Sequence, residues 1–133
     1  EVCGNNASII AKYQTVREQL VGLQRSFLVK PGLIADGRDM GTVVFPSSNL
    51  KIYLTADPNE RAKRRYNELK QKGINVRFAA VLDDLKQRDS RDKDRSVAPL
   101  KVSPDSVIID STNLSIDEVV LKILSLSKCR NII

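Results

Sequence analysis

The stretch from Leu33 to Pro46 places a short charged cluster directly after an apolar run. Leu33-Ile-Ala is followed by Asp36, a glycine, Arg38 and Asp39. An apolar run that stops at Asp-Gly predicts a buried strand ending in a turn, and ligands of open α/β sheets bind at that edge. Carboxylates and a guanidinium at this edge predict a binding or catalytic site. The alternative is a solvated turn after a strand.

The composition limits the chemistry that such a site can perform. The chain of 133 residues contains no histidine, which excludes Ser-His catalysis, Cys-His catalysis and His-ligated metals. Cys3 and Cys129 have no metal or redox spacing, so we expect free thiols in a reducing cytoplasm. The net charge of +6 favours nucleotides, nucleic acid or phosphorylated metabolites as partners. Clustered arginines favour phosphate, because the guanidinium fork binds phosphate bidentately.

A helix that begins near Arg77 carries a second candidate site. Its apolar positions recur at the spacing of one buried face: Phe78, Val81, Leu82 and Leu85. The same face continues through Arg88, Asp92 and Arg95. Charged groups cannot stay buried unpaired, so this face must line a cleft or pair internally. The alternative is a ladder of salt bridges on a solvated face.

The elements that position these residues follow from helix caps and apolar runs. Residues 1–14 are polar and expected to be irregular. Four helices are predicted: from Thr15, with Glu18 in a capping box, to Pro31-Gly32; from Asp57-Pro58-Asn-Glu60 to Gly73; from Arg77 to the segment Val97-Ala-Pro-Leu; and from Ser115, with Glu118 in a capping box. The last helix is expected to bury Ile116, Val119, Val120, Ile123 and Leu124.

Three short apolar strands are predicted at 33–35, 50–54 and 107–109, the last ending at Asp110. The order α-β-α-α-β-α predicts one α/β domain with a parallel sheet. No apolar run is long enough to span a membrane, and no signal-peptide pattern opens the chain.

The helix at 61–72 is strongly basic, with Arg61, Lys63, Arg64, Arg65, Lys70 and Lys72. It could be a solvated amphipathic surface with Ala62, Tyr66 and Leu69 turned inward. Alternatively, its arginines could close over a phosphate chain. The spacing slightly favours the solvated surface.

Four long motifs together carry a resemblance to a known family. They are Gly32-Leu-Ile-Ala-Asp-Gly-Arg-Asp-Met-Gly-Thr-Val-Val-Phe-Pro46, Lys51-Ile-Tyr-Leu-Thr-Ala56, Arg88-Asp-Ser-Arg-Asp-Lys-Asp-Arg-Ser-Val-Ala-Pro-Leu100 and Asp110-Ser-Thr-Asn-Leu-Ser-Ile-Asp-Glu-Val-Val120. In this order they resemble bacterial cytidylate kinases over essentially the whole chain. The resemblance implies a P-loop nucleoside monophosphate kinase with a three-layer α/β/α fold, located in the cytoplasm. It further implies transfer of the γ-phosphate of ATP to CMP or dCMP with Mg²⁺, as part of pyrimidine nucleotide metabolism.

The resemblance also assigns roles to residues of the acceptor site. Ser8, Arg17 and Asp39 would recognise cytosine. Arg88 and Asp92 would contact the sugar region, since a carboxylate accepts hydrogen bonds from ribose hydroxyls.

The catalytic roles fall on two further groups of residues. Arg38 and Arg95 would hold the acceptor phosphate, and Asp36 would orient hydrated Mg²⁺. A lid would span about 61–95, and three of its arginines could reach the transferring phosphates: Arg61, Arg64 and Arg65, of which Arg65 is preferred. Phosphoryl transfer requires positioning and positive charge, which suits an arginine-rich site without histidine.

The Gly-x-x-Gly-x-Gly-Lys-[Ser/Thr] phosphate loop of the family does not occur in this sequence. Gly4-Asn-Asn is no substitute, because no lysine follows it. We therefore expect a carboxyl-terminal part of the enzyme, which also lacks the family's CMP-binding insertion. The P-loop strand would lie between strands 33–35 and 50–54. Such a chain would be inactive alone, and would fold beside an amino-terminal piece or by exchange with another copy.

Two functions compete with an enzymatic one. The chain could bind CMP or other phosphates without catalysis. A basic nucleic-acid-binding domain is less favoured, because the chain has only three tyrosines, three phenylalanines and no tryptophan, and shows no nucleic-acid-reading motif.

Overall fold

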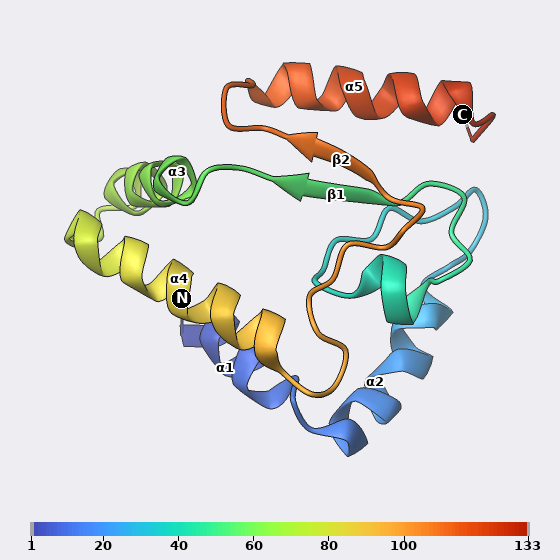
Figure 1. Cartoon of the computed structure of the whole chain (residues 1–133), viewed down its shortest axis with the longest axis horizontal. Coiled ribbons are helices and arrows are strands. Elements are labelled where there is room, and N and C mark those ends of the chain that lie inside the picture. Colours follow the sequence, from blue (N-terminus) through green and yellow to red (C-terminus); the bar gives the residue numbers. More distant parts are fainter. Residues whose placement is uncertain (1, 133) are drawn as a thin grey trace. The chain divides into compact units, whose positions relative to one another are not determined.

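The computed structural model describes residues 2–132 (Figure 1). Its elements in chain order are α1 (Val2–Ile10), α2 (Gln14–Ser26), the π-helical turn η1 (Met40–Val44), β1 (Ile52–Thr55), α3 (Pro58–Gln71), α4 (Phe78–Asp94), β2 (Val107–Asp110) and α5 (Ile116–Cys129). The chain forms two compact units, each described by itself below. Unit 1 comprises the residues up to Ser48 and Arg88–Pro104, and unit 2 comprises Asn49–Gln87 and the residues from Asp105 onward.

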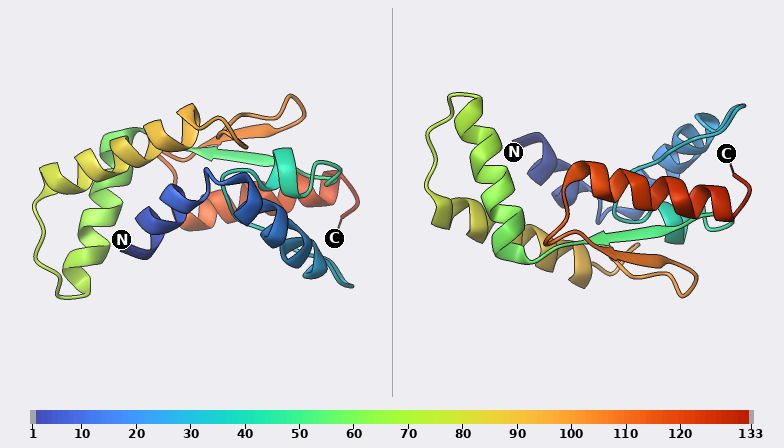
Figure 2. Two further views of the ribbon diagram at one scale, coloured as in Figure 1. Left: turned by 90° about the horizontal axis from the view of Figure 1, so that it is seen from below. Right: turned by 90° about the horizontal axis from the view of Figure 1, so that it is seen from above.

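Unit 2 contains a parallel sheet of two strands. β1 and β2 pair in register from Ile52 opposite Val107 to Thr55 opposite Asp110. Helix α5 runs alongside the two strands (Figures 1 and 2). The mixed α/β class and the parallel pairing are confirmed, and the strands at 50–54 and 107–109 are shifted by at most two residues at their ends.

Helix α3 begins where its cap predicts. The Asp57 carboxylate accepts hydrogen bonds from the N–H groups of Asn59 (2.8 Å) and Glu60 (3.3 Å), and Pro58 occupies the first helical position. The helix ends before Gly73, which adopts a φ of 73°.

Apolar side chains of three elements form the core of unit 2. Ala62 and Leu69 are buried on α3, Val81 on α4 and Ile109 on β2. Beside them, Tyr66 packs edge-on against Phe78, with the ring centroids 6.0 Å apart. The predicted inward face of α3 is therefore confirmed.

The amino end of α5 is held by the predicted capping box. Ser115 Oγ accepts from the Glu118 N–H (3.2 Å), and the Glu118 carboxylate accepts from the Ser115 N–H (2.8 Å). The predicted buried face of α5 is only partly correct. Val119 and Ile123 are half-buried, but Ile116 is 83% exposed. Val120 and Leu124 are exposed as well. Two strands of four residues each offer α5 a narrow surface, so only its central positions are covered.

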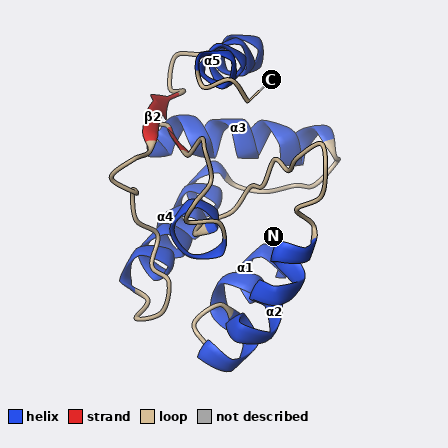
Figure 3. Ribbon diagram, turned by 90° about the vertical axis from the view of Figure 1, so that its right-hand side faces the viewer, coloured by secondary structure: helices blue, strands red, loops and turns tan. Residues whose placement is uncertain are grey.

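The described part of unit 1 consists of helices and loops (Figure 3). The expectation of irregular structure at 1–14 is wrong, because α1 spans most of this segment. Helix α2 starts at Gln14 after Tyr13, without a side-chain cap, so the capping box at Thr15 is also wrong. Glu18 accepts instead from Gln14 Nε2 at 2.7 Å. α2 ends at Ser26, before Pro31-Gly32.

The predicted strand at 33–35 does not form. Residues 32–36 have no regular structure, and Ile34 is fully exposed. Within residues 2–132 the only paired strands are β1 and β2, so this segment has no backbone partner to complete a ladder. A strand depends on such a neighbour, which an apolar run alone does not supply.

The turn after this segment is strongly held. The Asp39 carbonyl accepts from the N–H groups of Val43 (2.9 Å) and Val44 (3.2 Å), which starts η1. Val44 is buried. Arg25 of α2 donates from Nε to the Val44 carbonyl (2.8 Å) and from Nη2 to the Val43 carbonyl (3.1 Å).

No helix among the described residues is long and apolar enough to cross a membrane.

Candidate functional site

Asp92, on α4, is the centre of an ionic cluster in unit 1. It is 1% exposed. Ser8 of α1 donates its hydroxyl to Asp92 Oδ1 at 2.9 Å. Three guanidinium groups lie around the same carboxylate: Arg38 Nε at 3.0 Å, Arg88 Nε at 3.9 Å and Arg95 Nη1 at 3.9 Å. One buried carboxylate thus holds residues from three segments of unit 1 together.

This arrangement confirms the charged continuation of the predicted face of α4. Of the apolar part of that face, Val81 is buried and Leu82 and Leu85 are half-buried, whereas Phe78, at the first position of the helix, is 39% exposed, so its predicted burial is wrong. The face that buries Val81 continues through Arg88, Asp92 and Arg95 as expected. The alternative of a solvated ladder is wrong at its centre, because Asp92 is the most buried charged residue of the chain's described part. The charged end of the face pairs internally, as its burial requires.

Arg17 and Asp39 form a second ion pair in unit 1. Arg17 Nη2 contacts Asp39 Oδ2, and Arg17 Nη1 donates to the Ala11 carbonyl at 3.3 Å. Both side chains are almost buried, at 13% and 9% exposed. Because the Asp39 carbonyl begins η1, the backbone fixes the direction in which its carboxylate points.

Arg95 interacts both with Asp92 and with the Arg17–Asp39 ion pair. Its Nε donates to the Ala98 carbonyl at 2.5 Å, and its side chain is 6% exposed. Burial lowers the pKa of the Arg95 guanidinium, while the carboxylate of Asp39 raises it and the guanidinium of Arg17 lowers it. Arg38 extends the network outward, with Nη2 donating to Asp89 Oδ1 at 3.3 Å.

The cluster carries a positive charge and unused hydrogen-bonding capacity. It comprises four arginines and three carboxylates, hence a net +1: Arg17, Arg38, Arg88, Arg95, Asp39, Asp89 and Asp92. Among the described residues, two buried donors of the cluster have no hydrogen-bond partner: Arg88 Nε and Arg95 Nη2. The buried Asp92 Oδ2 accepts no well-aligned hydrogen bond either, although Arg38 Nε lies 3.0 Å from it in an ion pair. Such atoms require an explanation in a native structure, and a bound polar ligand is one. The cluster can bind an anion through its arginines and a hydroxyl through Asp92.

A cleft of about 380 Å³ opens beside Arg17 in unit 1. It is lined by Gln14, Arg17, Glu18, Val21, Val43, Val97 and Ala98. Three valines give it apolar walls, while Arg17 provides a cation at its edge. A flat, partly apolar group next to the Arg17–Asp39 pair would suit it.

Several residues that hold this site were missed from the sequence. Arg91 Nη2 donates to Asn5 Oδ1 at 2.8 Å, which fixes α1 against α4. Gly4 allows the close approach, since a Cβ there would lie 3.1 Å from Arg88 Nη1. Arg91 belongs to the Arg/Asp-rich run that drew attention to α4, whereas Arg25 carried no signal, because its partners are backbone carbonyls.

Asp36 lies exposed at the end of the segment 32–36. No group of three or more possible metal-ligating His, Cys, Asp or Glu residues occurs in the described chain. A single exposed carboxylate fits Mg²⁺ only where phosphate oxygens and water supply most of its ligands. Mg²⁺ is usually held on a nucleotide in this way, and the role of Asp36 toward Mg²⁺ stays a prediction.

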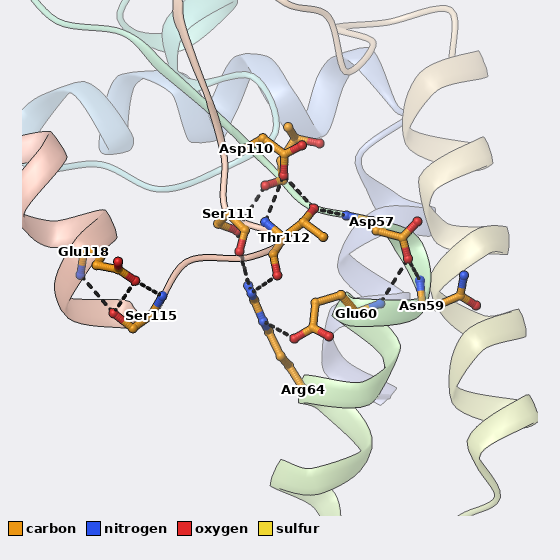
Figure 4. Close-up of polar contacts among 10 residues, drawn as sticks. Asp57, Asn59, Glu60, Arg64, Asp110, Ser111, Thr112, Ser115 and Glu118 are labelled. Atoms are coloured by element: carbon orange, nitrogen blue, oxygen red, sulfur yellow. Dashed lines mark hydrogen bonds and ion pairs between the residues drawn. The ribbon is translucent and has the colours of Figure 1, made fainter.

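The three arginines that were predicted to lie in a lid belong to unit 2, on α3. Arg65 Nη1 pairs with Glu68 Oε2 at 2.7 Å, and Lys72 Nζ pairs with Glu68 Oε1 at 2.5 Å. Hydrogen bonds from Lys72 and then Arg65 lower the pKa of Glu68 to about 2. Arg61 is half-buried, and Arg64 bonds to the loop after β2 (Figure 4).

The structure brings seven predicted site residues together in unit 1: Ser8, Arg17, Arg38, Asp39, Arg88, Asp92 and Arg95.

Comparisons with known proteins identify the family of the chain. The family model described as cytidylate kinase matches residues 1–129. Proteins named cytidylate kinase are 57% identical over 93% of this chain in Colwellia psychrerythraea, 53% over 96% in Proteus mirabilis and 51% over 94% in Methylococcus capsulatus. The matches cover 55%, 57% and 56% of those relatives, respectively, so the chain spans about half of their length. This chain belongs to the cytidylate kinase family.

Proposed function

We propose that this chain supplies the nucleotide-acceptor site of a cytidylate kinase, which transfers the γ-phosphoryl group of ATP to CMP or dCMP. One observation carries the proposal. Seven residues from separate segments meet in one net-positive cluster of unit 1 that retains unpartnered buried donors. The relatives are named cytidylate kinase, which supports cytidylate as the nucleotide.

The acceptor phosphate is bound by Arg38 and Arg95. Both guanidinium groups lie beside Asp92, and Arg95 Nη2 is a buried donor without a partner. A phosphate dianion would supply the acceptor, and charge-assisted bonds from arginine are the strongest of this kind. Asp92 Oδ2 would accept a hydrogen bond from a sugar hydroxyl, beside Arg88.

The base is recognised by Arg17 and Asp39; Ser8, also predicted to contact cytosine, donates its hydroxyl to Asp92 in the free chain. Cytosine presents an amino group, which donates to a carboxylate, next to ring acceptors, which accept from a guanidinium. Uracil presents a carbonyl oxygen in place of the amino group, and this oxygen would face the Asp39 carboxylate unfavourably. The nearly buried Arg17–Asp39 pair therefore selects cytosine over uracil.

Catalysis depends on positioning and charge. Arg38 and Arg95 orient the acceptor phosphate, and Asp36 orients water on Mg²⁺. Bound Mg²⁺ neutralises charge on the ATP phosphates. A lid of about residues 61–95 carries Arg61 and Arg65 toward those phosphates and excludes water.

The phosphate loop for ATP comes from outside these 133 residues, which contain no such motif. A separate amino-terminal piece would supply it, together with the central strand of a three-layer α/β/α fold. The chain alone would then bind the acceptor nucleotide without turnover.

The enzymatic proposal is tested by CMP-dependent release of ADP from ATP. The preparation should be shown by mass to contain this chain together with a phosphate-loop segment. We expect turnover with CMP and dCMP, little with UMP, and a large loss in Arg95→Ala. No turnover with either cytidine nucleotide would contradict the proposal.

Binding without catalysis is the second candidate, because the acceptor cluster lies entirely within unit 1. Calorimetry with CMP on the isolated chain tests it. Arg95→Ala should weaken binding, and equal affinity of the two proteins would count against the assignment of the cluster.

A further inference from the structure

Arg64 joins α3 to the loop between β2 and α5 in unit 2 (Figure 4). Its Nη2 donates to the carbonyls of Ser111 (2.6 Å) and Thr112 (3.4 Å), and its Nη1 donates to Ser111 Oγ (3.2 Å). Its Nε pairs with Glu60 Oε1 at 3.1 Å. All three guanidinium nitrogens are therefore engaged, and contact with a phosphate would require breaking some of these bonds.

The acceptors of Arg64 are themselves firmly held. The Asp110 carboxylate accepts from the N–H (2.8 Å) and hydroxyl (2.6 Å) of Thr112. Ser111 donates its N–H (2.8 Å) and hydroxyl (3.0 Å) to the Thr55 carbonyl, and the Asp57 N–H donates to Thr112 Oγ1 (2.8 Å). The loop is thus bonded to the carboxyl ends of both strands, which makes it a rigid support for α3.

Arg64 lies about 60° from Arg61 around the axis of α3, on the side away from Arg65. Arg61 and Arg65 are four residues apart and share one face of the helix. Arg64 projects about 100° away from Arg65 around the helix axis. A bond that fixes Arg64 therefore sets the rotation of α3, and with it the direction of Arg61 and Arg65.

We propose that Arg64 is a positioning residue that locks the first turns of α3 onto the β2–α5 loop, so that Arg61 and Arg65 point toward the donor phosphates. Arg64 itself does not bind the phosphates. This inference rests on the proposed function, since it assigns different roles to the three basic residues that the sequence grouped together.

Hydrogen exchange measured by mass spectrometry on this chain tests the lock without requiring activity. We expect the amides of residues 111–114 and 57–60 to exchange about 10–100-fold faster in Arg64→Ala, because bonds to a charged group are lost. Arg64→Lys should be intermediate, since it keeps one cation with fewer donors. Lys63→Ala, which removes the adjacent exposed cation, should leave exchange unchanged. Unchanged exchange in Arg64→Ala would overturn the proposal.

Steady-state kinetics of the complete kinase separate positioning from phosphate contact. Arg64→Ala should lower kcat while the KM for CMP stays constant, with partial rescue in Arg64→Lys. Arg65→Ala should lose turnover with normal exchange in residues 111–114. The same pattern in Arg64→Ala, lost turnover with normal exchange, would show that Arg64 contacts phosphate. Absence of turnover in the unmutated kinase would refute the proposed function, whereas the exchange result would still decide the role of Arg64.

Discussion

Replacing Asp92 with asparagine removes the one negative charge at the centre of the acceptor cluster and little else. Asparagine has nearly the same shape, and its carbonyl oxygen can still accept the hydrogen bond from Ser8, which is 2.9 Å in the native chain. The arginines at 3.0, 3.9 and 3.9 Å lose their shared counter-ion. We expect Asp92→Asn to destabilise unit 1 substantially.

The magnitude follows from the burial of the three arginines. A pair at about 4 Å gains roughly 4 kcal/mol at an effective dielectric constant of about 20, but most of this gain offsets desolvation. The side chains of Arg38 and Arg88 are 31% and 35% exposed, so water screens them, whereas Arg95 is only 6% exposed. Breaking one strongly buried pair costs about 3–5 kcal/mol. Arg95 is the one strongly buried partner of Asp92, so we expect the substitution to lower the free energy of unfolding by about 3 kcal/mol. This is a large part of the usual stability of a domain.

Urea unfolding of the chain, followed by circular dichroism, measures this loss. With a slope of about 1–3 kcal/mol per molar urea, the midpoint should fall by roughly 1–3 M. Asp94→Asn is the matched control, since Asp94 is an exposed aspartate two residues along α4, and its effect should stay within about 0.5 kcal/mol. An Asp92→Asn midpoint equal to that of the control would refute the reasoning that this carboxylate neutralises buried arginines.

Other consequences concern the base pocket, the support of η1 and the cap of α5. Asp39→Asn should raise kcat/KM for UMP relative to CMP by about 5–150-fold, because its amide can donate to the uracil carbonyl. Arg25→Ala should raise the KM for CMP with kcat nearly constant, since η1 loses the bond at 2.8 Å from Arg25 to the Val44 carbonyl. Ser115→Ala should lower the stability of unit 2 by about 1 kcal/mol in urea unfolding. Hydrogen bonds from Ser115 lower the pKa of Glu118 in the folded chain. The Glu118 carboxylate therefore contributes fully to the free energy of unfolding above its unfolded pKa of 4.5, and this contribution is lost as the pH falls through the lower folded pKa. Unfolding curves measured over a series of pH values should show this loss.

The elements that the sequence predicted well are those fixed by local interactions. The caps of α3 and α5 involve residues three positions apart, Asp57 with Glu60 and Ser115 with Glu118. The periodicity of α4 correctly carried its buried face as far as Asp92. Each of these patterns is complete within one helix, so a single sequence contains all the information.

The errors concern segments that depend on distant partners. Residues 33–35 form no strand, because no described neighbour pairs with them. α1 was missed because its supports are remote in sequence, Ser8 to Asp92 and Asn5 to Arg91.

The candidate site divides in the same way between local and remote information. Spacing pointed to the turn after 33–35 and to the end of α4. The convergence of Ser8 and Arg17 with these residues followed only from the family resemblance.

The unpartnered atoms around Asp92 link ligand concentration to the lifetime of the protein. Arg88 Nε and Arg95 Nη2 are buried donors without a hydrogen-bond partner in the free chain, so folding alone leaves them unsatisfied. A ligand that bonds to them stabilises the folded state by about 2.7 kcal/mol when its concentration is about 100 times its dissociation constant. Proteases act on the unfolded fraction, which the ligand depletes. We therefore expect the abundance of this chain in a cell to follow the supply of its nucleotide, without any dedicated regulatory domain.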